Sequence, residues 1–340
     1  MARFMSNDRA KITIQDVARA AGVAPSTVSR VLNKVTNDYI SEATRARVCE
    51  AAKGMGYTPN NAARALASGK SRLVGLWTTA LSDFYIEIMR HLDERARRDG
   101  FGLMASDIAW GSTPDDVTRA AQWPVDGVVV IDPYPGMPLP ENRTAARSLP
   151  VVAMGGLYWA EADYVAVDLA AGAKDAVRHL LAGGARRVAF VTPPVPGVDA
   201  RRESYTAEMR AAGRKPECLV TAKLSRQAGR QALLDFAKKH ALPDAIFCFN
   251  DVIAIGVQRA LHDLGARIPE DVALVGCDGI EDTEYTDPPL STIVHPLNAM
   301  CAKAWRFLRN RMADPDIALQ QVTMKPRLVV RGTSRAGGGK

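Results

Sequence analysis

The chain has 340 residues, enough for two or three domains, and its composition, 47% hydrophobic and 24% charged, is that of a folded globular protein. No apolar run approaches the roughly 18 residues of a membrane span, no signal-peptide pattern is present, and five scattered cysteines favour reduced thiols in the cytoplasm. Residues 1–70 contain 11 lysines and arginines against 5 acidic residues, whereas the remaining chain contains 33 against 32, so a polyanion partner is expected for the N-terminal part. A merely solvated basic face is the alternative explanation of this charge.

Three short helices are predicted within residues 13–57. Thr13 can cap the first, with Asp16 as its return partner. Gly22 supplies the bend that follows, Pro25 suits the first turn of the second helix, and Ser41 can cap the third. The apolar residues expected to form the core of this unit recur at helical spacing: Ile14, Val17, Ala18, Ala21, Val28, Val31, Leu32, Val48, Ala51, Ala52 and Met55.

Residues 58–72 have a different character. Asn60 can cap a short, alanine-rich helix running to Ala67, which a flexible Ser68-Gly69 pair would end. A helix of this length is unstable in water by itself. We therefore expect a hinge segment that becomes helical only when a partner holds it.

From Leu73 onwards, predicted strands alternate with predicted helices. The strands are 73–79, 101–106, 126–132, 150–155, 164–168, 187–192, 245–250 and 272–278. The helices are 84–99, 112–122, 170–184, 200–212, 226–240, 251–265 and 297–313. Continuous apolar strands separated by helices indicate parallel sheets that are covered on both faces.

The predicted domains follow from this order of elements. They are residues 11–58, a hinge at 59–72, an α/β part at 73–333 and a disordered tail at 334–340. The α/β part contains enough units for two subdomains, and we expect the chain to cross between them near 164–168, near 295 and near 320.

Two motifs carry a resemblance to a known family. Residues 13–33 read T-I-x-D-V-A-x-x-A-G-V-x-x-S-T-V-S-R-V-L-N, and residues 57–66 read Y-T-P-N-x-x-A-R-A-L. These motifs, with the later α/β pattern, resemble the lactose-repressor (LacI/GalR) family of bacterial transcription regulators over roughly residues 11–333. The resemblance implies an α/β fold with an N-terminal three-helix helix-turn-helix domain and a hinge helix. A periplasmic-binding-protein-like domain of two doubly wound parallel-sheet subdomains would follow.

The resemblance implies that the second helix enters the major groove of operator DNA. The base-contacting positions of the family correspond here to Pro25, Ser26 and Arg30. Arg30 can bind a guanine edge in bidentate fashion, although a phosphate contact or a solvated charge is the alternative. Ala24 stands where a capping serine is common in the family. Phosphate contacts are expected from Thr13, Thr27, Ser29 and Asn33.

The resemblance also implies a minor-groove contact from the hinge, at Asn60, Ala63 and Leu66. Leu66 matches the leucine that the family wedges between base pairs, which bends the duplex. The alternative is that Leu66 packs only between two hinge helices.

A ligand is expected between the two subdomains. The cleft positions of the family correspond to Arg201, Asn250, Asp251 and Asp278, a set that suits a polyhydroxylated molecule. Phe84 and Tyr85 follow the first strand and can stack on such a ligand, with Trp110 and Trp159 as weaker candidates, although each aromatic residue can equally belong to the core or the rim. The sequence departs from the family at Gly155, where many members have aspartate, at Asp168-Leu169 and at Ser204-Tyr205. The missing carboxylate at Gly155 puts an ordinary monosaccharide in doubt.

We therefore expect a homodimeric transcription regulator, and a repressor in particular, that binds double-stranded operator DNA under the control of a sugar or glycoside. No leucine-heptad tail follows the last strand, which favours a dimer over a tetramer. Neither a cofactor nor a metal is expected, because no catalytic motif occurs and the five histidines lack metal-ligand spacing. The alternatives are a solute-binding protein and a sugar-modifying enzyme fused to a DNA-binding module.

Overall fold

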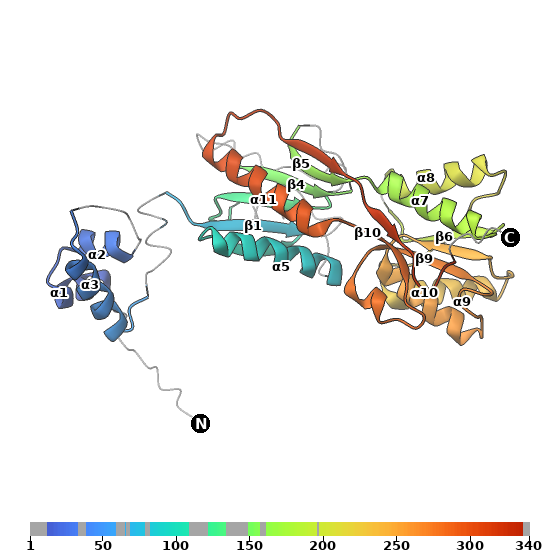
Figure 1. Ribbon diagram of the computed structural model, residues 1–340, viewed down its shortest axis with the longest axis horizontal. Helices are drawn as coiled ribbons and strands as arrows, with labels where there is room; N and C mark the ends of the chain where they lie inside the picture. The colour runs from blue at the N-terminus through green and yellow to red at the C-terminus, as the bar shows by residue number, and fades with distance from the viewer. Residues whose placement is uncertain are drawn as a thin grey trace, which may run out of the picture. The chain divides into compact units, whose positions relative to one another are not determined.

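The computed structural model describes residues 12–32, 39–58, 65, 69–78, 82–108, 122–133, 149–156, 161–195 and 197–335. The chain divides into two compact units, Met1–Ser71 and Arg72–Lys340, and both are drawn in Figure 1. Within the described residues, no helix is long and apolar enough to span a membrane.

The first unit contains the helices α1 (Ile14–Ala21), α2 (Pro25–Leu32) and α3 (Glu42–Gly54). The predicted capping box is confirmed, because the Asp16 backbone N–H donates to the Thr13 hydroxyl oxygen at 3.4 Å and the Thr13 backbone N–H donates to the Asp16 carboxylate at 2.9 Å. Gly22 ends α1 at a φ of 64°, a conformation that glycine adopts without strain. The predicted core residues are confirmed, since each is buried or packed against the buried cluster of this unit.

The second unit contains two six-stranded sheets. The first sheet is wholly parallel and has the order β11-β5-β4-β3-β1-β2. Its strands are β1 (Leu73–Thr78), β2 (Gly102–Asp107), β3 (Gly127–Ile131), β4 (Val151–Gly155), β5 (Asp163–Val167) and β11 (Gln321–Met324). The second sheet has the order β12-β10-β9-β8-β6-β7, and only β12 is antiparallel to its neighbour. Its strands are β6 (Val188–Thr192), β7 (Glu217–Val220), β8 (Ala245–Cys248), β9 (Ala273–Asp278), β10 (Ser291–Val294) and β12 (Arg327–Val329).

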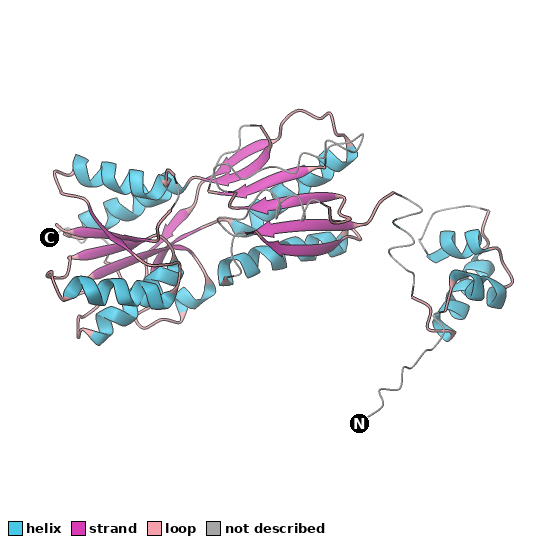
Figure 2. Ribbon diagram, turned by 180° about the vertical axis from the view of Figure 1, so that it is seen from behind, coloured by secondary structure: helices cyan, strands magenta, loops and turns pink. Residues whose placement is uncertain are grey.

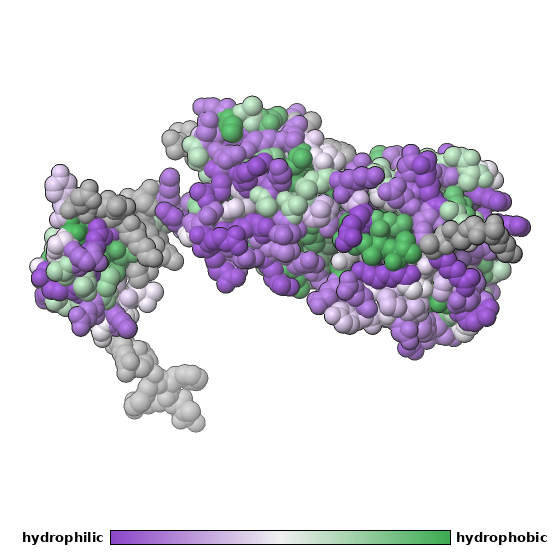
Figure 3. All heavy atoms as spheres, viewed as in Figure 1, coloured by the Kyte–Doolittle hydropathy of each residue, from purple (hydrophilic) through white to green (hydrophobic). Residues whose placement is uncertain are grey.

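Helices cover these sheets. Helices α5 (Asp83–Arg98) and α11 (Leu297–Ala313) pack together against the first sheet. The pair α7 (Leu169–Ala182) and α8 (Ala200–Ala211) lies on one side of the second sheet. The pair α9 (Arg226–Ala237) and α10 (Asp251–Asp263) lies on the other side, and a short 3₁₀ helix, η1 (Glu281–Glu284), follows β9 (Figure 2). Hydrophilic residues predominate on the face drawn in Figure 3, where an apolar area interrupts them on the second unit.

The structure adds four strands that the sequence did not predict: β7, β10, β11 and β12. Each has three or four residues. A segment this short is too brief to establish an alternation of polar and apolar residues. The buried polar residues Ser291 and Thr292 also interrupt the apolar pattern of β10, although β10 is hydrogen-bonded to a strand on each side. The predicted helix 112–122 lies outside the described residues except for Gln122.

The chain passes between the two sheets three times. It leaves the first sheet after β5, returns through α11 after β10, and crosses again between β11 and β12. Both subdomains are therefore built from separate stretches of sequence. Any relative movement of the two subdomains must be absorbed at these three connections.

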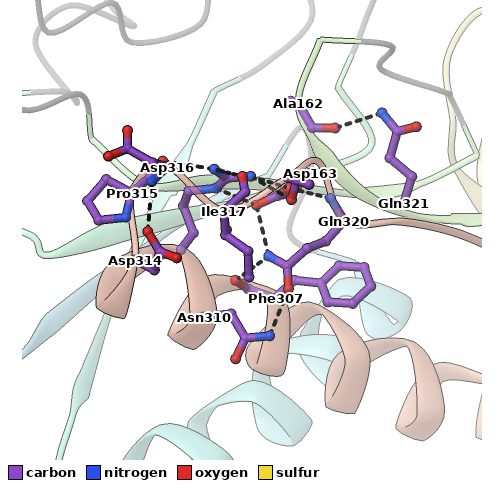
Figure 4. A network of polar contacts seen from close by, with 12 residues as sticks. Ala162, Asp163, Phe307, Asn310, Asp314, Pro315, Asp316, Ile317, Gln320 and Gln321 are labelled. Carbon is purple, nitrogen blue, oxygen red and sulfur yellow. Dashed lines mark hydrogen bonds and ion pairs between the residues drawn. The ribbon is translucent and has the colours of Figure 1, made fainter.

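A polar network fixes the last return to the first sheet (Figure 4). Arg311, near the end of α11, donates from Nε and Nη2 to the two carboxylate oxygens of Asp163 at 3.0 and 2.9 Å. The Gln320 backbone N–H donates to the same carboxylate at 2.8 Å. Because the Asp163 side chain is only 1% exposed, this bidentate ion pair is shielded from water. It joins the end of α11 and the approach to β11 to the start of β5.

Candidate functional site

Helix α2 separates an exposed polar face from a buried apolar one. Val28 and Val31 are buried in the core of the first unit, whereas Pro25, Ser26 and Arg30 are exposed. Ser26 and Arg30 are four residues apart and so lie on the same face of the helix. This face can be presented to a macromolecule without disturbing the core beneath it.

The other residues that were predicted to contact DNA differ in how exposed their side chains are. Thr27 and Ser29 are half-buried on α2. Thr13 is exposed, but its hydroxyl donates its proton to Asp16 at 2.7 Å, so the hydroxyl can only accept a further hydrogen bond while that contact lasts. The predictions for Asn33, Asn60, Ala63 and Leu66, together with those for Trp110 and Trp159, lie outside the described residues.

In the second unit, polar groups gather where the carboxyl ends of the two sheets meet. Tyr85, in the first turn of α5, donates its hydroxyl to Asp132 Oδ2 at 2.8 Å. Phe84 is 8% exposed and its ring lies edge-on to that of His295, with centroids 5.4 Å apart. Since α5 covers the first sheet and His295 follows β10 of the second, this pair packs the two subdomains together.

Arg201 is held rigidly at the start of α8. Its Nε donates to Asp199 Oδ1 at 3.1 Å, and its Nη1 donates to the backbone oxygen of Phe249 at 3.1 Å. The guanidinium carbon lies 3.5 Å from the centroid of the Phe249 ring, a cation–π contact. Burial by itself lowers the pKa of Arg201, but the charges of Asp199 and Asp278 raise this pKa overall. The guanidinium is therefore a permanent, oriented donor.

Asp278, the last residue of β9, has a strained backbone and a low exposed fraction. Its φ is 122°, it is 7% exposed, and its carboxylate forms no hydrogen bond or ion pair with a described residue. Burial and the charge of Asp251 raise the pKa of Asp278 well above the ordinary value, although Arg201 opposes them. A carboxylate on a strained backbone with a shifted pKa is typical of a binding site. The neighbouring Asn250 caps α10 through its side-chain oxygen, which accepts from Ile253 N at 3.0 Å.

The carboxylate of Asp251 is engaged within the second unit. It is fully buried, and its carboxylate accepts from the Thr292 hydroxyl at 2.6 Å, from Gly279 N at 2.6 Å and from Ile280 N at 3.0 Å. Burial raises its pKa to about 6 despite these bonds. Its oxygens hold the loop after Asp278 in place, and its predicted ligand contact stays a prediction.

Replacement of Asp251 by asparagine is expected to lower the free energy of unfolding by about 1–3 kcal/mol, because an amide leaves one of the buried donors unpaired. Urea unfolding followed by tryptophan fluorescence measures this effect. Asp278→Asn is the matched variant, and it should change ligand binding much more than stability. Unchanged stability with lost ligand binding in Asp251→Asn would contradict the positioning role.

Two residues of this site were missed by the sequence analysis, Asp132 and His295. Asp132 directly follows β3 in D-G-V-V-V-I-D, and a carboxylate at the end of a parallel strand was an available signal. His295 directly follows β10, a strand that was not predicted. Its Nδ1 is buried and has no hydrogen-bond partner among the described residues, and its Nε2 lies 3.6 Å from Cys277 Sγ.

The chain thus joins a helix-turn-helix unit to a two-sheet α/β unit of the periplasmic-binding type. Residues 13–60 match the model for "Bacterial regulatory proteins, lacI family", and residues 177–334 match that for a periplasmic binding protein-like domain. The ribose operon repressor of Escherichia coli is 31% identical over 333 residues, covering 95% of this chain and 99% of the relative. The transcriptional repressor PurR of Vibrio vulnificus is 30% identical over 329 residues, covering 94% and 98%. The protein therefore belongs to the lacI family of bacterial regulatory proteins.

Solved structures show the same fold. The Lac repressor dimer bound to operator and an anti-inducer matches with a TM-score of 0.81 at 24% identity, covering 96% of this chain and 99% of that one. The complex of the transcriptional regulator CelR with cellobiose matches with a TM-score of 0.66 at 26% identity, covering 95% and 100%. The predicted fold class and family are confirmed.

Proposed function

We propose that the protein is a ligand-responsive transcriptional repressor that binds a pseudo-palindromic operator as a homodimer. The Escherichia coli and Vibrio vulnificus relatives are named as repressors, and this chain covers nearly their whole length. The Lac repressor structure is a dimer on operator DNA. A regulator of this kind acts on the chromosome and performs no catalysis, so the proposal places the protein in the cytoplasm and excludes an enzyme.

The first unit would read the DNA. The exposed face of α2 would place Pro25, Ser26 and Arg30 against base edges in the major groove. Contacts to phosphate from Thr13, Thr27, Ser29 and Asn33 would set the position of the helix. The hinge residues Asn60, Ala63 and Leu66 would enter the minor groove at the centre of the operator.

The second unit would bind the ligand. The observation that carries this proposal is the convergence of polar groups from both subdomains: Tyr85 and Asp132 from the first, and Arg201, Asn250 and Asp278 from the second. Carboxylates accept hydrogen bonds from hydroxyl groups and a guanidinium donates them, so the set suits a sugar or glycoside. Similar solved structures contain sugars of this class: CelR is in complex with cellobiose, and a LacI family regulator from Arthrobacter is in complex with lactose.

Coupling between the DNA-binding unit and the ligand-binding unit would depend on the three connections that join the two subdomains. A ligand that binds both subdomains favours one position of the first subdomain relative to the second. The hinge segment leads directly into β1 of the first subdomain, so a change in that position would reach the hinge. The ligand would therefore change DNA affinity, and by reciprocity DNA would change ligand affinity by the same factor.

Selection of binding sites from random duplex DNA, followed by fluorescence anisotropy with the selected duplex, tests the DNA-binding part of the proposal. Arg30→Ala should lower affinity for the selected duplex by about 1–3 kcal/mol, with a much smaller loss on unrelated DNA, because a bidentate guanine contact is specific. Arg47→Ala is the matched control, since it removes one exposed arginine from α3. Equal losses on both duplexes for Arg30→Ala would mean that Arg30 contacts only phosphate.

A further inference from the structure

A single arginine bridges the two subdomains at the start of α9. Arg226 Nη2 donates to Asp83 Oδ2 at 2.8 Å and to Asp282 Oδ2 at 2.5 Å. Asp83 is the first residue of α5, which packs against the first sheet, whereas Arg226 and Asp282 belong to α9 and η1 of the second subdomain. The Arg226–Asp83 ion pair therefore joins one subdomain to the other, and the Arg226–Asp282 pair lies within the second.

The two carboxylates would repel each other without this arginine. Both accept from the same guanidinium nitrogen, so the oxygen of Asp83 and that of Asp282 lie close together, one from each subdomain. Glu281, next to Asp282 on η1, is exposed and adds a further negative charge to this end of the second subdomain. Because like charges at short distance repel, Arg226 turns a repulsive contact between the subdomains into an attractive one.

The backbone that carries Arg226 is fixed in place. Ser225 caps α9, because its hydroxyl oxygen accepts from Ala228 N at 3.1 Å. Helix α10 passes so close that a Cβ atom built on Gly256 would lie 1.9 Å from the Arg226 backbone oxygen, so this position of α10 has room only for glycine. The Arg226 side chain therefore extends from a rigid point of the second subdomain, and it reaches Asp83 only while the first subdomain stays close.

The residues of this bridge are neighbours of the proposed ligand site along the chain. Asp83 directly precedes Phe84, whose ring lies edge-on to that of His295 in the other subdomain, with centroids 5.4 Å apart. Asp282 lies four positions after Asp278, the last residue of β9. The ion bridge and the ring pair therefore hold the same two edges of the subdomains together.

We propose that Asp83, Arg226 and Asp282 form an electrostatic latch that holds the two subdomains together before any ligand binds. This latch goes beyond the proposed function, which assigns no residue to that task. The three side chains are about half exposed, so water and salt weaken the latch and it biases the closed arrangement without locking it. The latch thereby sets how much of the binding free energy of a ligand is needed for closure.

Pulsed electron paramagnetic resonance measures the distance between the subdomains and tests this inference. Nitroxide labels are attached to cysteines introduced at two exposed positions, Ala302 on α11 and Gln231 on α9, and the exposed Cys49 and Cys218 are replaced by serine. Labelled full-length protein is diluted into an excess of unlabelled protein, so that the distance within one subunit dominates the signal. The measurement needs neither ligand nor DNA, so its result is independent of the proposed function.

Changes at Asp83 should shift the distance distribution in a graded way. Asp83→Asn removes one charge and should raise the ratio of open to closed protein about threefold, the effect of losing one exposed ion pair. Asp83→Lys places a second cation beside Arg226 and replaces attraction by repulsion, so it should raise this ratio about tenfold. Combining Asp83→Lys with Arg226→Glu restores an opposite-charge pair, with Asp282 as a second acceptor for the lysine, and should return the distribution to that of the unchanged protein.

Glu94→Lys is the matched control, because Glu94 is exposed further along α5 and the substitution changes the charge by the same amount. An unchanged distance distribution in Asp83→Lys would overturn the inference. Equal opening in Glu94→Lys would reveal a general effect of charge on α5, and failure of the charge swap to restore closure would reveal local disruption. Either of these results would also overturn the latch. Thermal unfolding of each variant confirms that it is folded.

Discussion

Replacement of Arg201 by alanine is expected to abolish the response to ligand and to lower the free energy of unfolding of the second unit by about 3–5 kcal/mol. The guanidinium is the positive partner of Asp199, whose side chain is 4% exposed, and its loss leaves that carboxylate buried and unpaired. The cation–π contact with Phe249 and the hydrogen bond to its backbone oxygen are lost at the same time. The negative charge beside Asp278 also increases.

Tryptophan fluorescence during urea unfolding measures this effect selectively. All five tryptophans follow residue 71, so the signal reports the second unit alone. Arg210→Ala is the matched control, because Arg210 lies on the same helix and is exposed, and such a change alters stability by less than about 0.5 kcal/mol. If Arg201→Ala kept the stability and ligand affinity of the unchanged protein, the proposed roles of Arg201 in pairing with Asp199 and in binding the ligand would be wrong.

Replacement of Arg311 by alanine is expected to destabilise the second unit by a similar amount, about 3–5 kcal/mol. Asp163 would lose its bidentate partner while remaining almost fully buried. Arg311 Nη1 also donates to the backbone oxygens of Pro315 and Ile317 at 2.9 and 2.5 Å, and these acceptors lie between α11 and β11. The variant therefore loosens the return of the chain to the first sheet.

The same unfolding measurement applies to Arg311. Arg306→Ala is its control, since Arg306 is exposed on the same helix and forms no ion pair with a described residue. Comparison of Arg201→Ala with Arg311→Ala also separates ligand binding from stability. Arg311 lies away from the polar groups of the ligand site, so its loss should leave the ligand preference unchanged. A change in stability of less than about 1 kcal/mol for Arg311→Ala would mean that the network around Asp163 relaxes without it.

The N-terminal unit could be predicted from the sequence almost residue by residue. The capping box of Thr13 and Asp16, the glycine at position 22 and the inward positions of Val28 and Val31 all depend on residues within four places of one another. Helix geometry alone brings such residues together. The alternation of long strands and helices after Leu73 has the same local origin, and it correctly indicated two sheets, which are parallel apart from β12.

The ligand site was predictable only in part. Arg201, Asn250 and Asp278 follow from the resemblance, and the structure brings Arg201 and Asp278 within electrostatic reach of each other. Asp251 also fits the motif, yet its oxygens are turned towards Thr292 and the loop after β9. The motif records which residue type occurs at a position, but it does not record which way the side chain points.

The sequence by itself determined the helix-turn-helix unit, the α/β class and the family, because each rests on local periodicity and contiguous motifs. Only the tertiary structure decided that Asp132 occupies the space beside Gly155, 23 positions further along the chain, and that the ring of Phe84 packs against that of His295 from the other subdomain. The three connections between the sheets create these contacts between distant segments. Free energies of burial and charge pairing depend on such contacts, which no local pattern in the sequence encodes.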